Sequence, residues 1–428
     1  MESTKQIPHW FRLDNAAKIF PSIINKRTTT VYRISASITR SVDSEILQRA
    51  LIKTLNRFPY YRVSLRWGFF WHYLQYNPQD PLVQKENGAP CRKISPDDNN
   101  GYLFRIFYYE KRISLECSHI ITDGTGAVTF LRSLLCQYFI ETGITIKNRD
   151  DIFNIEKPPH VEEFEDAYRK FYKKDIPAPS KKEKAFHIIE KLIDADDQNI
   201  ITGIIDVKEL LKIARNYGVT ITELLSSVYL HSLYLYAQDL PWKIKKKELK
   251  PIRLMVPVNL RKIYKSKTMR NFFLTVSPGI DPRLGHYNFE DVIKEVYHYM
   301  RLEVDERFIN QQINRNVNGE IHPLVRLVPL PLKVLVERLL YGFVATSRQS
   351  GVLTNMGAVS MPSEIEKHIE RFDCIANPNE DTKINCGVIS YHDKIHITFG
   401  SLVDSTIVQM YFFQTLRKMD LAIKIETN

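Results

Sequence analysis

The segment Cys117–Gly124, which reads Cys-Ser-His-Ile-Ile-Thr-Asp-Gly, lies where one periodicity of the sequence ends and another begins. Polar and apolar residues alternate over 112–117 with the period of 2 that a β-strand produces. After Gly124, apolar residues recur at helical spacing as far as Tyr138. The segment is therefore predicted to join a strand to a helix. His119 shares the parity of the apolar strand residues, so its side chain is predicted to point inward at the end of the strand.

A histidine at a buried strand end can take a proton from a hydroxyl or an amine near neutral pH, because its ordinary pKa lies close to that pH. Asp123 could fix the imidazole or hold the loop, and Gly124 leaves room for a tight turn or a substrate. These residues alone leave two other interpretations open: a core histidine followed by a helix-capping aspartate, and a metal-binding pair. We expect no metal, because no third ligand is evident and His119 lies on strand-like sequence.

The rest of the chain separates into two halves with a loosely similar order of strands and helices. Proline-rich stretches at 158–159 and 176–182 indicate a connection between them. We predict a first lobe over 1–145, a crossover linker over 146–190 and a second lobe over 191–428. Strands are predicted at 31–38, 62–65, 70–75, 103–109, 112–118, 199–207, 252–258, 386–391 and 394–399. Helices are predicted at 43–57, capped by Ser41 or Asp43, at 208–216, and at 221–238, where Thr220 and Glu223 form a capping box; 288–314 is predicted to be mostly helical.

Composition narrows the class of protein. The 428 residues carry a net charge of +11 and are 44% hydrophobic, which suits a globular protein with a large core. The densest basic run, 243–250, is interpreted as a solvated loop, and no nucleic-acid-binding, Gly-x-Ser-x-Gly, dinucleotide-binding or P-loop motif is present. The five cysteines lack Cys-x-x-Cys spacing, which predicts reduced thiols. Without an apolar leader or about 18 consecutive apolar residues, the expected location is the cytoplasm and no transmembrane segment is expected.

The segment 118–124 resembles the His-x-x-x-Asp-Gly signature of the acyltransferases related to chloramphenicol acetyltransferase. This superfamily includes alcohol acetyltransferases, plant-type acyl-CoA acyltransferases, wax-ester synthases and the condensation domains of peptide synthetases. Further similar stretches follow in order along the chain and favour the alcohol-acetyltransferase branch. They are 42–62, with its Pro-Tyr-Tyr-Arg exit, 217–223, 256–261 (Val-Pro-Val-Asn-Leu-Arg), 270–272 (Arg-Asn-Phe) and 354–357 (Thr-Asn-Met-Gly), followed by Met361-Pro362.

The resemblance implies an α/β fold of two chloramphenicol-acetyltransferase-like lobes with a tunnel between them. His119 would lie in the tunnel as general base, and Asp123 would be structural, paired with Arg261. Acyl-CoA would be a co-substrate, with no permanently bound cofactor. Thr354, Asn355 and Gly357 would line the tunnel and help to stabilise the oxyanion. The candidates for binding the CoA phosphates are Lys262, Lys265, Lys267 and Arg270.

Two departures from the family patterns decide among its branches. Condensation domains carry His-His-x-x-x-Asp-Gly, whereas Ser118 occupies the first position here. The plant-type Asp-Phe-Gly-Trp-Gly motif is absent from the sequence. We therefore expect a monomeric O-acyltransferase that moves an acyl group, most simply acetyl, to a small alcohol. An N-acyltransferase with an amine acceptor, a carrier-protein-dependent relative and a non-catalytic binding member are the alternatives.

Overall fold

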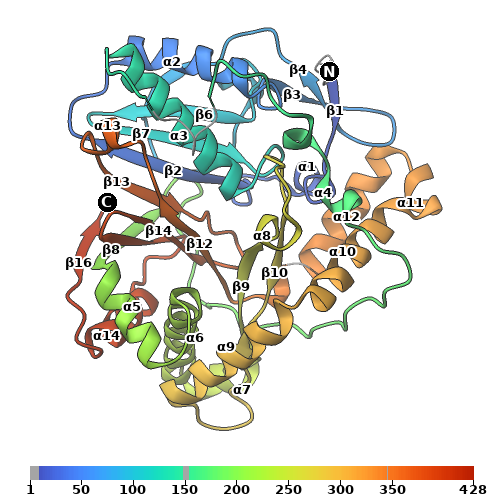
Figure 1. Cartoon of the computed structure of the whole chain (residues 1–428). Coiled ribbons are helices and arrows are strands. Elements are labelled where there is room, and N and C mark those ends of the chain that lie inside the picture. The colour runs from blue at the N-terminus through green and yellow to red at the C-terminus, as the bar shows by residue number, and fades with distance from the viewer. Residues whose placement is uncertain (1–8, 148–153, 345) are drawn as a thin grey trace.

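Two large β-sheets divide the chain into two lobes, which lie one above the other in Figure 1. The computed structural model describes residues 9–147, 154–344 and 346–428. In this part of the chain, the first sheet has five strands in the order β13-β2-β7-β6-β5. The second has eight, β10-β9-β12-β14-β15-β8-β16, with β11 paired to β9. A small sheet, β1-β4-β3, packs with the first lobe.

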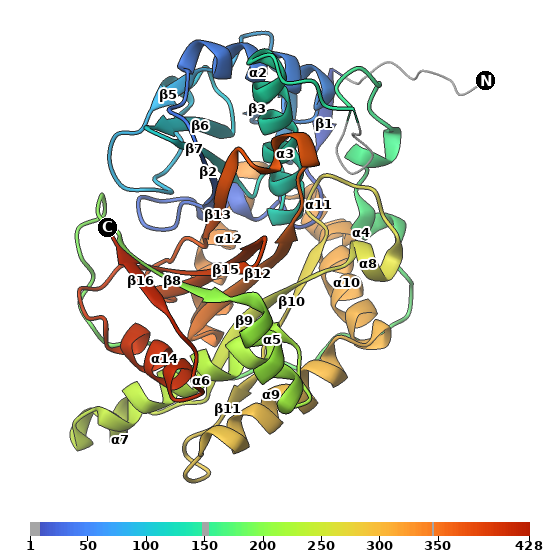
Figure 2. The ribbon, with the colours of Figure 1, turned by 60° about the vertical axis from the view of Figure 1, so that its left-hand side comes forward.

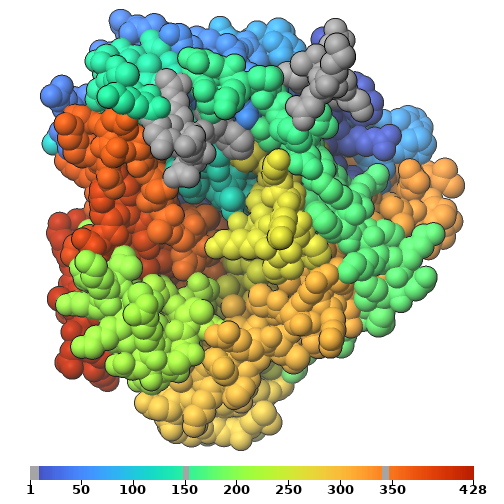
Figure 3. Space-filling view, viewed as in Figure 1, coloured from blue at the N-terminus to red at the C-terminus, as the bar shows by residue number. Residues whose placement is uncertain are grey.

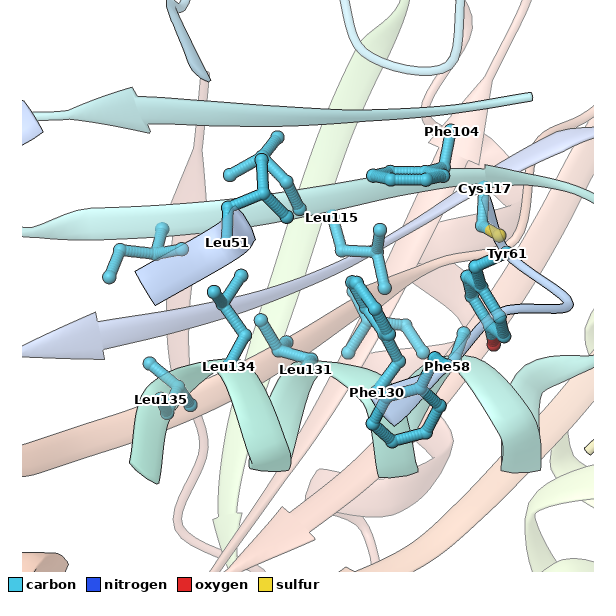
Figure 4. Close-up of a cluster of buried hydrophobic side chains, with 14 of the residues drawn as sticks. Leu51, Phe58, Tyr61, Phe104, Leu115, Cys117, Phe130, Leu131, Leu134 and Leu135 are labelled. Atoms are coloured by element: carbon cyan, nitrogen blue, oxygen red, sulfur yellow. The ribbon is translucent and has the colours of Figure 1, made fainter. Parts of the chain in front are cut away.

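Helices α2 (Ser44–Arg57) and α3 (Gly124–Glu141) pack together over one face of the first sheet. Of the two predicted caps, Asp43 is the one that caps α2, because its side chain accepts hydrogen bonds from two backbone N–H groups. Figure 4 shows the core between helices and sheet, where side chains of both helices meet those of the strands. Each fully buried apolar side chain there contributes about 1.5–3 kcal/mol. The strands of this lobe are β1 (Trp10–Arg12), β2 (Val31–Ile38), β3 (Val63–Arg66), β4 (Tyr73–Tyr76), β5 (Val83–Lys85), β6 (Phe104–Tyr109) and β7 (Arg112–Ser118), with α1 (Phe20–Ile23) and the short 3₁₀ turn η1 (Pro96–Asp98) between them.

The polar face of β7 is also buried, which its alternating sequence did not indicate. Glu116 is 1% exposed, and its carboxylate accepts hydrogen bonds from the guanidinium groups of Arg33 and Arg105. The backbone N–H of Cys91 donates to the same carboxylate, so the segment that contains Cys91 covers this face. A buried carboxylate is tolerable when it is paired and hydrogen-bonded in this way. The strand is therefore enclosed on both sides.

The second lobe packs its helices against the eight-stranded sheet (Figure 2). A capping box formed by Thr220 and Glu223 begins α6, as predicted. The basic run 243–250, interpreted above as a loop, instead forms most of the short helix α7, whose residues are largely exposed. The elements are β8 (Asn199–Asp206), α5 (Val207–Asn216), α6 (Ile221–Asp239), α7 (Trp242–Glu248), β9 (Ile252–Asn259), α8 (Arg261–Tyr264), β10 (Phe273–Val276), β11 (Gly279–Ile280), α9 (Phe289–Glu303), η3 (Thr346–Arg348), β12 (Gly351–Val359), β14 (Ile384–Tyr391), β15 (Lys394–Ser401), α14 (Ile407–Arg417) and β16 (Lys424–Thr427).

One segment from the second half of the sequence completes the first lobe. Strand β13 (Ile369–Ile375) follows α13 (Ser363–Glu366) and pairs antiparallel with β2, so it forms the edge of the first sheet. Phe372 and Ile365 are buried in the first lobe's core. The lobes are therefore not separated by a single cut at the 146–190 linker. The chain crosses into the second lobe and later returns to the first.

The linker itself is anchored to the first lobe. Its residues 148–153 lie outside the described part of the chain, and the remainder includes η2 (Val161–Phe164) and α4 (Ala167–Lys170). Glu163 is 2% exposed and receives two hydrogen bonds of 2.7 Å from the Arg57 guanidinium at the end of α2. The backbone N–H of Met269 donates to the Glu163 carbonyl at 2.6 Å. The linker thus ties the first lobe to the connection between β9 and β10.

The helical segment predicted at 288–314 is two helices. It breaks after α9 because Asp305 caps a new helix, α10 (Glu306–Ile321). Two further helices, α11 (Pro323–Leu327) and α12 (Leu330–Val344), follow at the edge of the molecule (Figure 1). Within the described ranges, no helix has the length and apolar character needed to cross a membrane.

Candidate active site

His119 immediately follows β7 and lies among aromatic rings from three other elements. Its ring centroid is 4.4 Å from that of Tyr32 on β2, 5.5 Å from Phe20 on α1 and 5.9 Å from Phe273 on β10. Its backbone is fixed on both sides, because its N–H donates to the Thr30 carbonyl at 3.0 Å and its carbonyl accepts from Asn271 at 2.8 Å. The residue keeps part of its surface accessible. The imidazole is therefore held in a defined place with an apolar surround.

This surround sets the charge state of the imidazole. Burial lowers the pKa of His119 to about 4, although the Asp123 carboxylate and the polar groups of Asn271 and Thr122 act in the opposite direction. Desolvation disfavours the charged form of a histidine, which is the direction seen here. His119 is therefore neutral at physiological pH and has a lone pair available to accept a proton.

The carboxylate of Asp123 is fully occupied away from the imidazole. It accepts hydrogen bonds from both terminal nitrogens of Arg261, at 2.8 and 3.1 Å, and from the backbone N–H groups of Gly126, at 3.1 Å, and Phe272, at 2.9 Å. Asp123 is 4% exposed and is the N-cap of α3. A bidentate pair of this kind is a strong, geometrically specific interaction. Asp123 thus joins the first turn of α3 to a segment of the second lobe.

That segment is the connection between β9 and β10, residues 260–272, which lies between the two lobes in Figure 3 (yellow). The Thr122 hydroxyl donates to the Met269 carbonyl at 2.6 Å, and the Asn259 amide donates to the Thr125 hydroxyl at 3.0 Å. The Asn271 amide donates both to the His119 carbonyl and, at 3.0 Å, to the carboxylate of Asp14. Together with Asn259 at the end of β9, the connection therefore contacts His119, Thr122, Asp123 and Thr125 of the 119–125 stretch.

Two glycines of this stretch have different structural roles. A Cβ on Gly124 would lie 2.4 Å from the sulfur of Met356, which is the movable end of a flexible side chain. A Cβ on Gly126 would lie 2.0 Å from the Thr122 hydroxyl oxygen and 2.4 Å from the Met269 carbonyl oxygen. The backbone approach that only glycine permits is thus at Gly126, whereas the space at Gly124 is filled by Met356.

The predicted tunnel residues lie on β12 in the centre of the second sheet. The strand is irregular between Asn355 and Ala358, and Gly357 has a φ of +78° there. The Asn355 side-chain NH₂ group donates to the Thr222 hydroxyl at 3.0 Å, and the side-chain oxygen Oδ1 of Asn355 accepts from the Gly357 N–H at 2.9 Å. Thr354 precedes this irregularity and is partly exposed. Because Met356 contacts Gly124, the irregular part of β12 faces the beginning of α3.

The four predicted CoA-binding cations lie in different environments. Lys262 and Lys265 are exposed on and just after α8. Lys267 is exposed and lies 3.6 Å from the Glu162 carboxylate. Arg270 is 5% exposed, and its guanidinium donates to the Arg12 carbonyl and lies 3.5 Å from Asp14. A buried, paired guanidinium is not presented to a ligand, so Arg270 serves the packing of the site.

Sequence reasoning did not identify the inner wall of the site. Phe20, Tyr32 and Phe273 carried no pattern that distinguishes them from core residues, and Asp14 belongs to a segment without clear periodicity. Burial raises the pKa of Asp14 to about 6, against the charge of Arg270. Asn271 did stand in the Arg-Asn-Phe stretch quoted above, which was the only signal that could have pointed to it.

Solved structures share this arrangement of lobes over nearly the whole chain. TRI3 trichothecene 15-O-acetyltransferase from Fusarium sporotrichioides aligns with a TM-score of 0.59 and 11% identity, covering 98% of this chain and 96% of that one. TRI101 of F. sporotrichioides, complexed with coenzyme A and T-2, aligns with a TM-score of 0.60 and 10% identity, over 98% and 100%. The wax ester synthase/diacylglycerol acyltransferase from Marinobacter aquaeolei VT8 gives 0.56 and 12%, over 96% and 98%.

By its fold, the protein belongs to the class of mixed α/β, two-lobed proteins that resemble chloramphenicol acetyltransferase. The expected fold class is thereby confirmed. Acyltransferases and condensation domains share this fold, and some similar structures contain coenzyme A. No family model and no curated protein matches the sequence.

Proposed function

We propose that this protein is an acyl-CoA-dependent acyltransferase that moves an acyl group, most simply acetyl, from CoA to an alcohol hydroxyl. The observation that carries the proposal is the different bonding of two neighbouring groups. Asp123 gives both carboxylate oxygens to Arg261 and to two backbone N–H groups. His119 is neutral, held by its backbone and surrounded by apolar rings. Such a pair supplies one base and one structural carboxylate.

The proposed reaction needs only this base. The imidazole of His119 takes the proton of the acceptor hydroxyl as its oxygen attacks the thioester carbonyl carbon. The tetrahedral intermediate then collapses, the carbon–sulfur bond breaks, and the thiolate of CoA receives the proton from the imidazolium. The products are an ester and free CoA, with no acyl-enzyme. The aromatic surround favours the neutral imidazole before and after the cycle.

The remaining parts of the proposed site belong to the second lobe. We place the tunnel for the two substrates between the lobes, where β12 faces the start of α3. A backbone N–H group or the Thr354 hydroxyl near the β12 irregularity would stabilise the developing oxyanion. Exposed Lys262 and Lys265 would attract the phosphates of CoA, because a cation at the mouth of a site raises the local concentration of anions.

The test is a panel of acyl-CoA donors of increasing chain length with pooled alcohols and, separately, pooled amines, followed by the release of free CoA thiol. We expect release with alcohols and a loss of about 10²- to 10⁴-fold in His119→Ala, the range for a general base. His396→Asn is the control, because burial also lowers the pKa of His396, which lies on β15 and is 3% exposed. The control should retain turnover.

The outcomes separate the alternatives. Release only with amines would make the protein an N-acyltransferase, with the same base. Transfer only from an acyl group carried on a carrier protein would identify a condensation-type relative. No transfer from any donor in a folded protein would leave a binding protein, and unchanged turnover in His119→Ala would refute the role of His119.

A further inference from the structure

Helix α12 exposes four apolar side chains and turns Lys333 and Glu337 toward the protein. Leu332, Leu335, Val336 and Leu339 are between 50% and 59% exposed. They recur at the spacing of one helix face. By contrast, Lys333 is 4% exposed. A surface helix normally has the opposite arrangement, so the outward face of α12 is suited to an apolar environment.

The contacts beneath α12 fix this orientation. The Lys333 ammonium donates to the Phe70 carbonyl at 2.9 Å and lies 3.3 Å from the centre of the Trp71 ring. The Glu337 carboxylate accepts a hydrogen bond of 2.5 Å from the Ser22 hydroxyl, and Arg338 Nε donates to the Ser22 carbonyl at 2.7 Å. These three charged side chains would lose their partners if the helix rotated to bury its leucines. The apolar face is therefore held outward.

The exposed apolar surface continues onto α11, which lies next to α12 in Figure 1, and onto the turn between β3 and β4. Leu324 and Leu327 of α11 are each 70% exposed. In the turn between β3 and β4, Trp67 and Phe69 are 65% and 73% exposed. The Leu330 N–H donates to the Phe69 carbonyl at 2.9 Å, so the turn is attached to the start of α12. We call the whole surface the apolar face: Trp67, Phe69, Phe70, Leu324, Leu327, Leu332, Leu335, Val336 and Leu339.

The apolar face is flanked by exposed positive charge. Of the charged residues in the segments that carry this face, Arg57 and Arg62 are paired with Glu163 and Asp80, and the one acidic residue of α12, Glu337, is turned toward Ser22. Exposed Arg66, Arg326 and Arg338 flank the apolar side chains. Leucine and aromatic side chains beside arginines are typical of elements that lie in the interface of a membrane, and basic residues attract anionic lipid headgroups.

We propose that the apolar face docks on an anionic lipid surface, with its leucines and aromatic rings at the boundary between headgroups and acyl chains. In the described ranges no helix could span a bilayer, so the docking is peripheral. A cavity of about 530 Å³ adjoins the apolar face, and both Phe70 of this face and the neighbouring Arg326 line the cavity. Helix α1, which is bonded to α12 through Ser22, also contributes Phe20 to the ring cluster around His119.

This placement has a consequence that rests on the proposed function. Helix α1 contacts α12 on one side and His119 on the other. A lipid surface at the apolar face would therefore bring lipophilic acceptor molecules to the side of the protein nearest to this helix. The docking itself does not depend on turnover. Failure of the acyl-transfer test and failure of the docking test are therefore distinguishable.

The test is flotation of the full chain with vesicles in a density gradient. Vesicles of phosphatidylcholine alone are compared with vesicles that also contain phosphatidylserine. The variant Leu335→Gln/Leu339→Gln removes two exposed apolar side chains that make no core contribution. Its matched control is Leu284→Gln/Leu302→Gln, because those leucines are 79% and 54% exposed but lie outside the apolar face.

We expect the parent and the control to float with the anionic vesicles, and salt to weaken this binding. The Leu335→Gln/Leu339→Gln variant should bind at least about tenfold more weakly, because less apolar area is buried at the surface. Equal flotation of that variant, or a parent that stays at the bottom with both vesicle types, would overturn the proposal. If the parent instead doubles its mass in solution and the variant does not, the apolar face is an interface between two copies.

Discussion

Replacing Asp123 by Asn would leave the size of the side chain nearly unchanged but remove its charge and one of its acceptor oxygens. The carboxylate accepts four hydrogen bonds, two of them from Arg261. An asparagine accepts through one oxygen, and its NH₂ group would face N–H donors on the other side. The substitution therefore leaves the guanidinium without its counter-charge, and one guanidinium N–H and one backbone N–H lose this acceptor.

The magnitude follows from how deeply this pair is buried. The side chains of Arg261 and Asp123 are 10% and 6% exposed. Removing one partner of a buried ion pair costs about 3–5 kcal/mol, because the remaining charge is left uncompensated. Arg261 keeps its hydrogen bonds to the Thr268 carbonyl, at 2.7 Å, and to the Asn259 side chain, at 3.3 Å. We therefore expect the lower end, about 3 kcal/mol of unfolding free energy.

The assay is urea unfolding of parent and variant, followed by circular dichroism. Asp281→Asn is the control: Asp281 also pairs with an arginine, at 2.6 Å, but the Arg283 side chain is 43% exposed, so little change is expected. Arg261→Gln should destabilise like Asp123→Asn, and the double variant should lose less than the sum of the two, because both remove the same pair.

A different result would refute the structural role. If Asp123→Asn unfolds at the same urea concentration as the parent but loses its turnover, the carboxylate takes part in the reaction. Additive losses in the double variant would mean that the Asp123–Arg261 contact contributes little. Either result would require another account of the His-x-x-x-Asp spacing.

Two further predictions follow from the same site. Gly126→Ala should lower the unfolding free energy by about 1–3 kcal/mol, because the added Cβ would overlap Thr122 and Met269. The control is Gly319→Ala on α10, where the added Cβ has nothing within 4 Å and should be neutral or slightly stabilising. Equal effects of the two substitutions in urea unfolding would contradict this prediction. With an alcohol acceptor, kcat/KM should stay level as the pH falls from 8 to about 5, because the neutral imidazole of His119 is the active form. It should decline only as His119 is protonated near its lowered pKa of about 4. A decline centred near pH 6.5 would instead show an ordinary, solvated histidine.

The elements that the sequence predicted well are those whose signals are local. The Asp43 cap, the Thr220–Glu223 capping box and the strand that precedes His119 depend on residues only a few positions apart. The segment 288–314 was predicted to be mostly helical, which is confirmed, but the cap at Asp305 that divides it into two helices was overlooked. Local chemistry was sufficient to place the histidine at a strand end and the aspartate at a helix start.

The features that could not be predicted depend on pairing between distant segments. Strand β13 joins β2 across more than three hundred residues, and nothing in its own sequence names that partner. Glu116 has the polar parity that usually marks a solvated face. Arg33 and Arg105 from neighbouring strands and the backbone N–H of Cys91 make its burial tolerable. The leucines of α12 show the opposite deviation: their apolar pattern suggests burial, but they are exposed. The bonds of Lys333 and Glu337 beneath the helix hold these leucines outward.

The candidate site also depends on distant segments and is not formed by the His-x-x-x-Asp-Gly stretch alone. Asn271 and Phe272 bond to His119 and Asp123 from 152 and 149 residues away. Bringing such distant groups together costs chain entropy, which only the packing of both lobes offsets. Residues 1–145 alone would keep the histidine, but they would lack Arg261, Asn271 and the ring of Phe273, as well as the edge strand β13. The base is therefore positioned by the second lobe, and changes in the 260–272 connection should act on His119 without touching it.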